Sequence, residues 1–113
     1  MKEFYNSLTF DGTDYYMQSV NLREFCDTAA TPFYIYDMNY IIRKYEYLKK
    51  CFPYEGVRVF YAMKANFNPH ILRIMKDNHF CLDTVSPAEV ILARKIGFEP
   101  ENITVEVGWG EAT

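Results

Sequence analysis

Hydrophobic and polar positions follow two alternating periods along the chain, and together they predict strands followed by helices. Short β-rich runs begin at about residues 33, 57, 80 and 103, and the first three are each followed by the apolar spacing of one helix face. The starts lie 24, 23 and 23 residues apart. This regularity favours a parallel sheet, either doubly wound or part of a (β/α)8 barrel.

Local stop and start signals support these boundaries. The predicted strands cover residues 32–36, 57–62, 80–85 and 103–107. Asn68 is suited to cap the second helix, with Pro69 in its first position. Ser86 and Glu89 form a capping box before the third helix, which Gly97 ends.

The N-terminal part has a different pattern. Residues 8–17 predict a hairpin that turns at Asp11 and Gly12, and Asn21 begins a short capped helix that leads to Pro32. We therefore divide the chain into an N-terminal segment, residues 1–30, and a barrel segment, residues 31–113.

Composition excludes several classes of protein. The chain has 113 residues, 50% hydrophobic and 24% charged, with a net charge of −3. These values indicate one globular domain that binds neither nucleic acid nor a membrane, and the sequence shows no membrane span or signal peptide. Aromatic residues make up 18%, a large apolar surface for so short a chain. The three cysteines, Cys26, Cys51 and Cys81, are expected to be reduced in the cytoplasm and packed as small hydrophobic side chains.

Two ionisable residues occupy unusual positions. Lys64 directly follows a strand that should be buried, and the carboxyl ends of barrel strands face the active site, where a lysine can act as a Schiff-base amine. The alternative is an exposed loop lysine. Asp83 interrupts an apolar strand, and it is either a charge partner of Lys64 or a solvated aspartate at a strand end.

The remaining candidates have structural explanations. Ser86 and Glu89 already serve the capping box. His70 and His79 have no companion at a metal-ligand spacing, so no metal site is predicted. The sequence has no glycine-rich phosphate loop, and Gly108 to Gly110 resembles a turn.

Three motifs together resemble a known family. These are residues 31–37 (TPFYIYD), residues 61–66 (YAMKAN) and residues 83–89 (DTVSPAE), with gaps of 19 and 25 residues from Lys64 to Asp83 and Glu89. They are similar to fold-type III pyridoxal-phosphate-dependent decarboxylases, the family that includes diaminopimelate, ornithine and arginine decarboxylases. The likeness is greatest to the diaminopimelate branch.

The resemblance implies roles for the matched residues. Lys64 would hold pyridoxal phosphate as a Schiff base, with Ala62 under the cofactor and Asp83 beside the lysine. Glu89 and Ser86 would orient the groups that touch the cofactor. The implied substrate is an amino acid, diaminopimelate, with ornithine or arginine as alternatives, and the complete enzyme would be a cytoplasmic homodimer.

The resemblance also implies that more chain belongs to the fold. A barrel of this kind needs about 250 residues, and the family adds a β domain, which residues 1–30 would join. We therefore expect this sequence to be an N-terminal fragment, about four βα units long, that is inactive alone. The alternative is a non-catalytic relative that acts as a binding or assembly protein.

Overall fold

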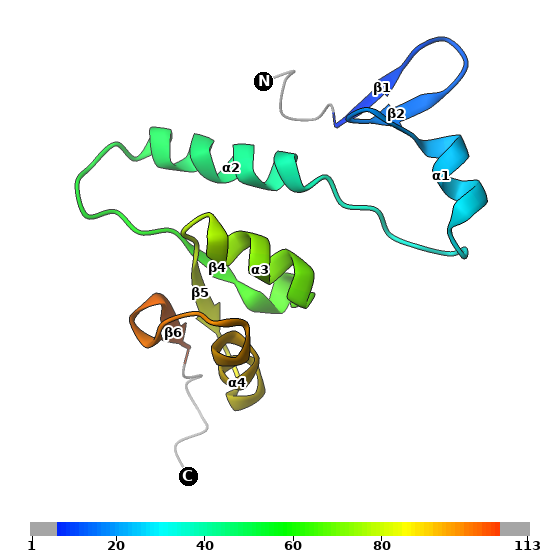
Figure 1. Ribbon diagram of the computed structural model, residues 1–113. Coiled ribbons are helices and arrows are strands. Elements are labelled where there is room, and N and C mark those ends of the chain that lie inside the picture. Colours follow the sequence, from blue (N-terminus) through cyan, green and yellow to red (C-terminus); the bar gives the residue numbers. More distant parts are fainter. Residues whose placement is uncertain (1–6, 107–113) are drawn as a thin grey trace. The chain divides into compact units, whose positions relative to one another are not determined.

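The computed structural model describes residues 7–106. Two compact units make up the chain, Met1–Lys44 and Tyr45–Thr113, and we describe each unit by itself. Helix α2 (Met38–Cys51) begins in the first unit and ends in the second (Figure 1). It ends at Cys51, two residues before Pro53, which cannot continue a helix.

The first unit contains a small antiparallel sheet and a short helix. Strands β1 (Leu8–Phe10), β2 (Tyr15–Met17) and β3 (Val20–Asn21) pair in chain order, and α1 (Leu22–Thr28) follows. The backbone N–H groups of Thr13 and Asp14 each donate to Oδ1 of Asp11 at 2.8 Å. Gly12 supplies the positive φ of +102° that the turn requires. The predicted hairpin is confirmed.

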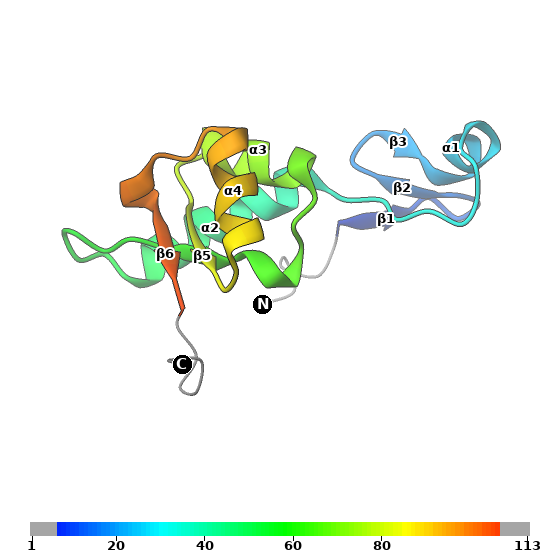
Figure 2. The same ribbon diagram turned by 90° about the horizontal axis from the view of Figure 1, so that it is seen from below.

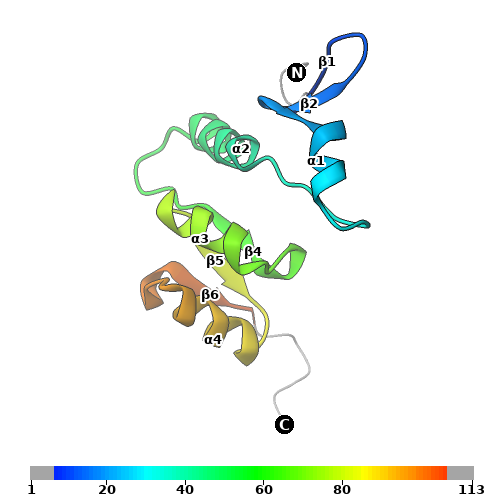
Figure 3. The same ribbon diagram turned by 45° about the vertical axis from the view of Figure 1, so that its right-hand side comes forward.

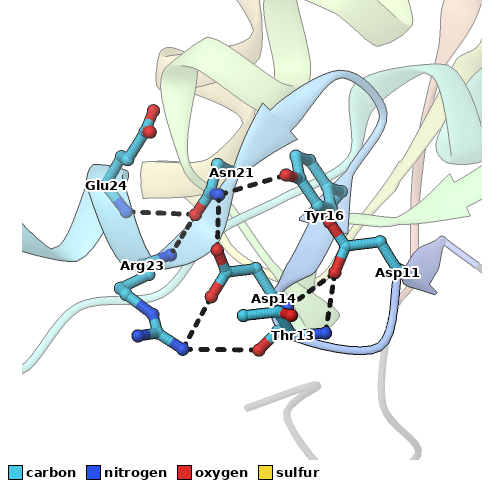
Figure 4. A network of polar contacts seen from close by, with 7 residues as sticks. All are labelled: Asp11, Thr13, Asp14, Tyr16, Asn21, Arg23 and Glu24. Carbon is cyan, nitrogen blue, oxygen red and sulfur yellow. Dashed lines mark hydrogen bonds and ion pairs between the residues drawn. The ribbon is translucent and has the colours of Figure 1, made fainter.

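Polar side chains connect this hairpin to α1. Asn21 caps the helix, because its Oδ1 accepts from the N–H groups of Arg23 and Glu24 at 2.9 and 3.2 Å. Its Nδ2 donates to Asp14 at 3.1 Å and to the Tyr16 hydroxyl at 3.3 Å. Arg23 also pairs with Asp14 at 2.7 Å. Figure 4 shows that these contacts form one continuous network.

The strand predicted over residues 32–36 is wrong, since this segment is not in a strand. A run with high β propensity becomes a strand only when a neighbour pairs with it, and no described residue does so here. The segment leads instead to Asp37, whose Oδ1 accepts from the Tyr40 N–H at 3.0 Å and thereby caps α2. The same carboxylate accepts from Gln18 at 2.9 and 3.0 Å.

The second unit is built on a parallel sheet. Strands β4 (Phe60–Ala62), β5 (Cys81–Thr84) and β6 (Ile103–Val105) lie in that order, with β5 in the centre. Helix α3 (Pro69–Asp77) connects β4 to β5, and α4 (Pro87–Ile96) connects β5 to β6. Figures 2 and 3 show both helices along the sheet. This βαβαβ order confirms the predicted parallel sheet. The strands are shorter than predicted, and Val107 lies outside the described residues.

The core of this unit lies between the sheet and its helices. Leu82 and Thr84 of β5 are completely buried, as are Leu72 of α3 and Ala93 of α4. The hydroxyl of Thr84 donates to the Thr104 carbonyl at 2.7 Å, so this buried polar group is satisfied.

A second part of the core involves Tyr45, in the middle of α2. The Tyr45 ring stacks on Phe80 with ring centroids 3.9 Å apart. Its hydroxyl donates to the His79 carbonyl at 2.9 Å. The Tyr45 ring is therefore held by both an apolar and a polar contact.

The helix ends follow the sequence signals. Asn68 Oδ1 accepts from the His70 N–H at 2.9 Å, and Pro69 is the first residue of α3. Gly97 ends α4 with φ of +109°. The predicted cap and stop are confirmed.

The cysteines are only partly as predicted. All three thiols are free, and Cys81 is buried, but Cys26 and Cys51 are exposed. The prediction that they pack as small hydrophobic side chains is therefore wrong for two of them, because they lie on the solvent side of their helices. No helix within residues 7–106 has the length and apolar character needed to span a membrane.

Candidate cofactor site

The carboxyl edge of the parallel sheet positions Lys64. After β4 the chain enters the 3₁₀ turn η2 (Met63–Ala65), in which Met63 is completely buried. The Tyr61 hydroxyl donates to the Asn66 carbonyl at 3.1 Å and closes the turn. With its neighbour anchored in the core, the Lys64 side chain is directed outward and is 60% exposed. A primary amine is thus presented to solvent at the edge where barrel enzymes place their active sites.

Glu106 is the charge partner that the structure gives Lys64. Their Nζ and Oε2 atoms are 3.9 Å apart, and the glutamate side chain is 58% exposed. The N–H of Glu106 donates to the Thr84 carbonyl at 2.8 Å, which fixes its backbone against the end of β5. An exposed pair of this length is weak, so it can orient the ammonium group without sequestering it.

Asp83 and Ala62 lie side by side in the sheet. The β4–β5 register pairs Ala62 with Asp83, and the β5–β6 register pairs Asp83 with Thr104. The Thr104 hydroxyl donates to Asp83 Oδ1 at 3.1 Å. Since side chains alternate along a strand, Asp83 faces away from the core that buries Leu82 and Thr84. The structure brings together Ala62, Asp83 and Thr104, while Lys64 contacts Glu106.

Ser86 and Glu89 begin α4 directly after β5. Ser86 Oγ accepts from the Glu89 N–H at 3.3 Å, as predicted. Glu89 Oε2 accepts from the Val85 N–H at 2.7 Å, not from Ser86 as a capping box requires. Only Val85 and Ser86 separate β5 from α4, and the Glu89 carboxylate reaches back to the amide one residue before the cap. Both side chains therefore fix the backbone at the carboxyl end of β5.

The donor set fits one part of pyridoxal phosphate. Lys64 offers an accessible amine for the aldehyde of the cofactor. The phosphate of the cofactor requires cations or a backbone nest. Within residues 62–66, 83–86 and 104–106 the single cation is Lys64. These segments thus offer an amine that could attach the aldehyde, and they do not supply a phosphate cradle.

Sequence reasoning singled out Lys64, Asp83 and Ala62 but missed Glu106 and Thr104. The available signal was the strand spacing, which aligns the ends of β5 and β6 and so places residues near 83 and 105 side by side. No group of three potential ligands that could hold a metal occurs in the described part of the chain. The turn predicted at Gly108 to Gly110 lies outside that part.

Comparison with known proteins identifies the family. A family described as "Pyridoxal-dependent decarboxylase, pyridoxal binding domain" matches residues 38–109. The chain belongs to this family. The predicted resemblance is confirmed, and membership implies pyridoxal phosphate as the cofactor.

The similar curated proteins are much longer than this chain. Diaminopimelate decarboxylase of Aquifex aeolicus is 36% identical over 91% of this chain and 24% of its own length. The enzyme of the same name from Methanothermobacter thermautotrophicus is 38% identical over 71% of the chain and 19% of its own length. The chain thus spans about a quarter or less of these relatives.

Solved structures confirm the fold as part of this family's barrel. A crystal structure of AQ1208 from Aquifex aeolicus has a TM-score of 0.85 at 36% identity, covering 95% of this chain and 27% of that protein. Diaminopimelate decarboxylase from Helicobacter pylori, complexed with L-lysine, has a TM-score of 0.62 at 33% identity, covering 75% and 22%.

Proposed function

We propose that this chain is the part of a pyridoxal-phosphate-dependent amino-acid decarboxylase that holds the cofactor through Lys64. The proposed substrate is meso-diaminopimelate, with L-lysine and carbon dioxide as products. The observation that carries the proposal is the position of Lys64, an exposed amine at the carboxyl edge of the sheet in a chain of this family.

The residues around Lys64 support this role. When bound, pyridoxal phosphate supplies an electron sink for the electron pair released as carbon dioxide leaves. Lys64 provides the amine that attaches the cofactor, and the buried Met63 holds its backbone still. Glu106 attracts the ammonium form, and its exposure leaves the amine accessible.

Asp83 and the α4 cap are proposed to support the cofactor from β5. The hydrogen bond from Thr104 orients the Asp83 carboxylate, and the bond between Val85 and Glu89 fixes the strand end two residues later. Diaminopimelate is favoured over ornithine or arginine because the similar curated enzymes carry that name, and because the Helicobacter pylori relative was crystallised with L-lysine.

Chemical trapping tests the cofactor role directly. The chain is incubated with pyridoxal phosphate, reduced with borohydride, digested and analysed by mass spectrometry. We expect a phosphopyridoxyl group on the peptide that contains Lys64, and its loss in Lys64→Ala. Lys95→Ala is the matched control, since Lys95 is an exposed lysine on α4. Equal labelling of all exposed lysines would contradict a specific role for Lys64.

Carbon dioxide release tests the substrate. Because the segments around Lys64 supply no phosphate cradle, we expect the chain of 113 residues to attach the cofactor without releasing carbon dioxide from diaminopimelate. A longer protein that contains this sequence together with the rest of the barrel is expected to release it. Faster release from ornithine or arginine would reassign the substrate.

A non-catalytic role in assembly is the second candidate. It is favoured by large apolar side chains exposed in the second unit, among them Tyr54 at 73%, Phe67 at 62% and Ile91 at 56%. Sedimentation velocity distinguishes the two roles. A stable oligomer in which Lys64 is not labelled would support assembly over cofactor binding.

A further inference from the structure

A cavity of about 350 Å³ lies at the amino edge of the parallel sheet. It is enclosed by the residues that precede β4 and β6, the start of β5, and the ends of the helices. Four basic side chains line it: Lys49, Arg58, Lys76 and His79. They come from three segments of the second unit, namely the end of α2, the residues before β4, and the end of α3 with the turn after it, so the fold brings these segments together.

The topology explains why these basic side chains line the same cavity. In a βα unit each helix runs opposite to its strands, so the carboxyl-terminal ends of the helices lie at the amino edge of the sheet. Lys49 lies in the last turn of α2 and Lys76 in the last turn of α3, where a positive charge is favourable. Stabilisation of helix ends alone would not require these residues to line one cavity.

Arg58 is fixed in position. Its Nη2 donates to the Glu101 carbonyl at 2.7 Å, to Asn102 Oδ1 at 2.6 Å and to Cys81 Sγ at 3.3 Å. A guanidinium group has five N–H donors. Within residues 7–106 these bonds use Nη2 alone, which leaves the donors on Nη1 and Nε for a ligand. The arginine is therefore ordered before a ligand arrives.

The Lys76 side chain lies beside Gly97, which has no side chain of its own. A Cβ placed on Gly97 would be 3.4 Å from Lys76 Nζ, so the absence of a side chain at Gly97 leaves room for the ammonium group. Asp77, its neighbour in sequence, pairs with it at 3.6 Å but does not line the cavity. The amine can thus face the cavity while retaining a partner outside it.

The charge of the cavity is opposite to that of the chain. Lys49, Arg58 and Lys76 are basic side chains of the lining, and its single carboxylate, Glu99, lies 3.6 Å from Arg94. The chain as a whole carries −3. Several basic side chains around one cavity, one of them an ordered guanidinium, suit the charge and oxygen geometry of a phosphate group.

We propose that this cavity binds a phosphate group, either free or as part of a small phosphomonoester. The cavity is larger than one phosphate, so the organic part of an ester also fits, next to the stacked rings of Tyr45 and Phe80. The site is separate from Lys64, because Arg58 precedes β4 and Lys64 follows it. The strand between them spans about 10 Å at about 3.3 Å per residue.

Calorimetric titration of the full chain tests the proposal, with inorganic phosphate and glycerol phosphate as probes. No pyridoxal phosphate is added, so failure of the cofactor proposal does not affect the result. We expect saturable binding that weakens as salt is added, and at least about tenfold weaker binding in the double variant Lys49→Gln/Lys76→Gln, about 1.4 kcal/mol. The control Lys50→Gln/Lys95→Gln removes the same charge from the same kinds of helix outside the cavity and should bind within about twofold of the parent chain.

Each outcome decides the proposal. Tighter binding of glycerol phosphate would identify an ester site, and equal binding would identify a site for the phosphate group alone. No saturable binding of either probe, or equal loss in the control variant, would overturn the proposal. If the double variant fails to fold by circular dichroism, amide shifts in the parent chain decide, since a site in the cavity must perturb residues 79–81 and 97–99.

Discussion

Within residues 45–106, large side chains such as Leu72, Leu82 and Phe98 are buried from water. Within residues 7–44, every side chain is at least partly exposed. The first unit is instead organised by the polar network around Asn21 and Asp14. Burial of a leucine contributes about 1.5–3 kcal/mol, while a single hydrogen bond contributes about 1 kcal/mol net. The second unit therefore has the larger reserve of stability, although both units follow clear local signals.

The largest expected effect comes from the centre of the sheet. Leu82→Ala removes a completely buried side chain from β5 and should cost about 2–5 kcal/mol. Urea unfolding followed by circular dichroism measures it. Ile91→Ala is the control, since Ile91 on α4 is 56% exposed. Similar costs for the two variants would show that the second unit is not stabilised by its core.

A smaller effect is expected at the cap of α1. Asn21→Ala removes the acceptor for two backbone N–H groups and the donor to Asp14 and Tyr16, so we expect a cost of about 1–2 kcal/mol. Hydrogen exchange of the amides in α1 measures it. Asn21→Ser keeps an uncharged cap acceptor and loses the amide donor, and it should recover most of the protection. Unchanged exchange in Asn21→Ala would show that the polar network does not hold the first unit together.

Tyr45 adds a dependence on alkaline pH to the second unit. Burial, with a smaller contribution from Cys81, raises the pKa of its phenol above the ordinary value of 10.0. The folded state then keeps the proton to higher pH than the unfolded state, so stability is fully present below about pH 10 and falls as the pH rises through the folded pKa.

The variant Tyr45→Phe separates two contributions of Tyr45 to stability, its hydrogen bond and its raised pKa. Below pH 10 the variant lacks the hydrogen bond to the His79 carbonyl and should lose about 1 kcal/mol. Above pH 10 this difference in stability should shrink, because the parent chain loses stability as Tyr45 ionises, whereas phenylalanine has no group to ionise. Thermal unfolding at a series of pH values measures it, and a difference that stays constant up to pH 11 would exclude the raised pKa.

Features set by neighbouring residues could be predicted from the sequence, and those set by long-range pairing could not. The caps at Asn21, Asn68 and Ser86 depend on side chains two or three residues from the amides they satisfy. The segment at residues 32–36 has the composition of a strand, but strand formation requires a partner from elsewhere in the chain.

The site follows the same division. The position of Lys64 could be predicted because it follows β4 directly in sequence. Its partner Glu106 could not, because that contact depends on how β4, β5 and β6 are aligned in the sheet. The basic cavity is the extreme case, since its four basic side chains come from three segments that the fold brings together.

The smallest expected effect is at Asp11, where the hairpin turns. The backbone N–H groups of Asp14 and Thr13 stabilise the ionised carboxylate and lower the pKa of Asp11 below its ordinary value of 3.8. The folded hairpin therefore gains stability above pH 3.8 and loses it as the pH falls through the folded pKa. Carboxyl chemical shifts during an acid titration measure this pKa in the native chain and again in urea, where it should return to its ordinary value. Asp11→Asn keeps an oxygen acceptor for both amides and lacks the ionisable group, so the hairpin should persist but lose this acid dependence. The same pKa in the native and unfolded chains would mean that the turn is not formed in solution. The first unit would then lack the hydrogen bonds from the Thr13 and Asp14 amides to Asp11.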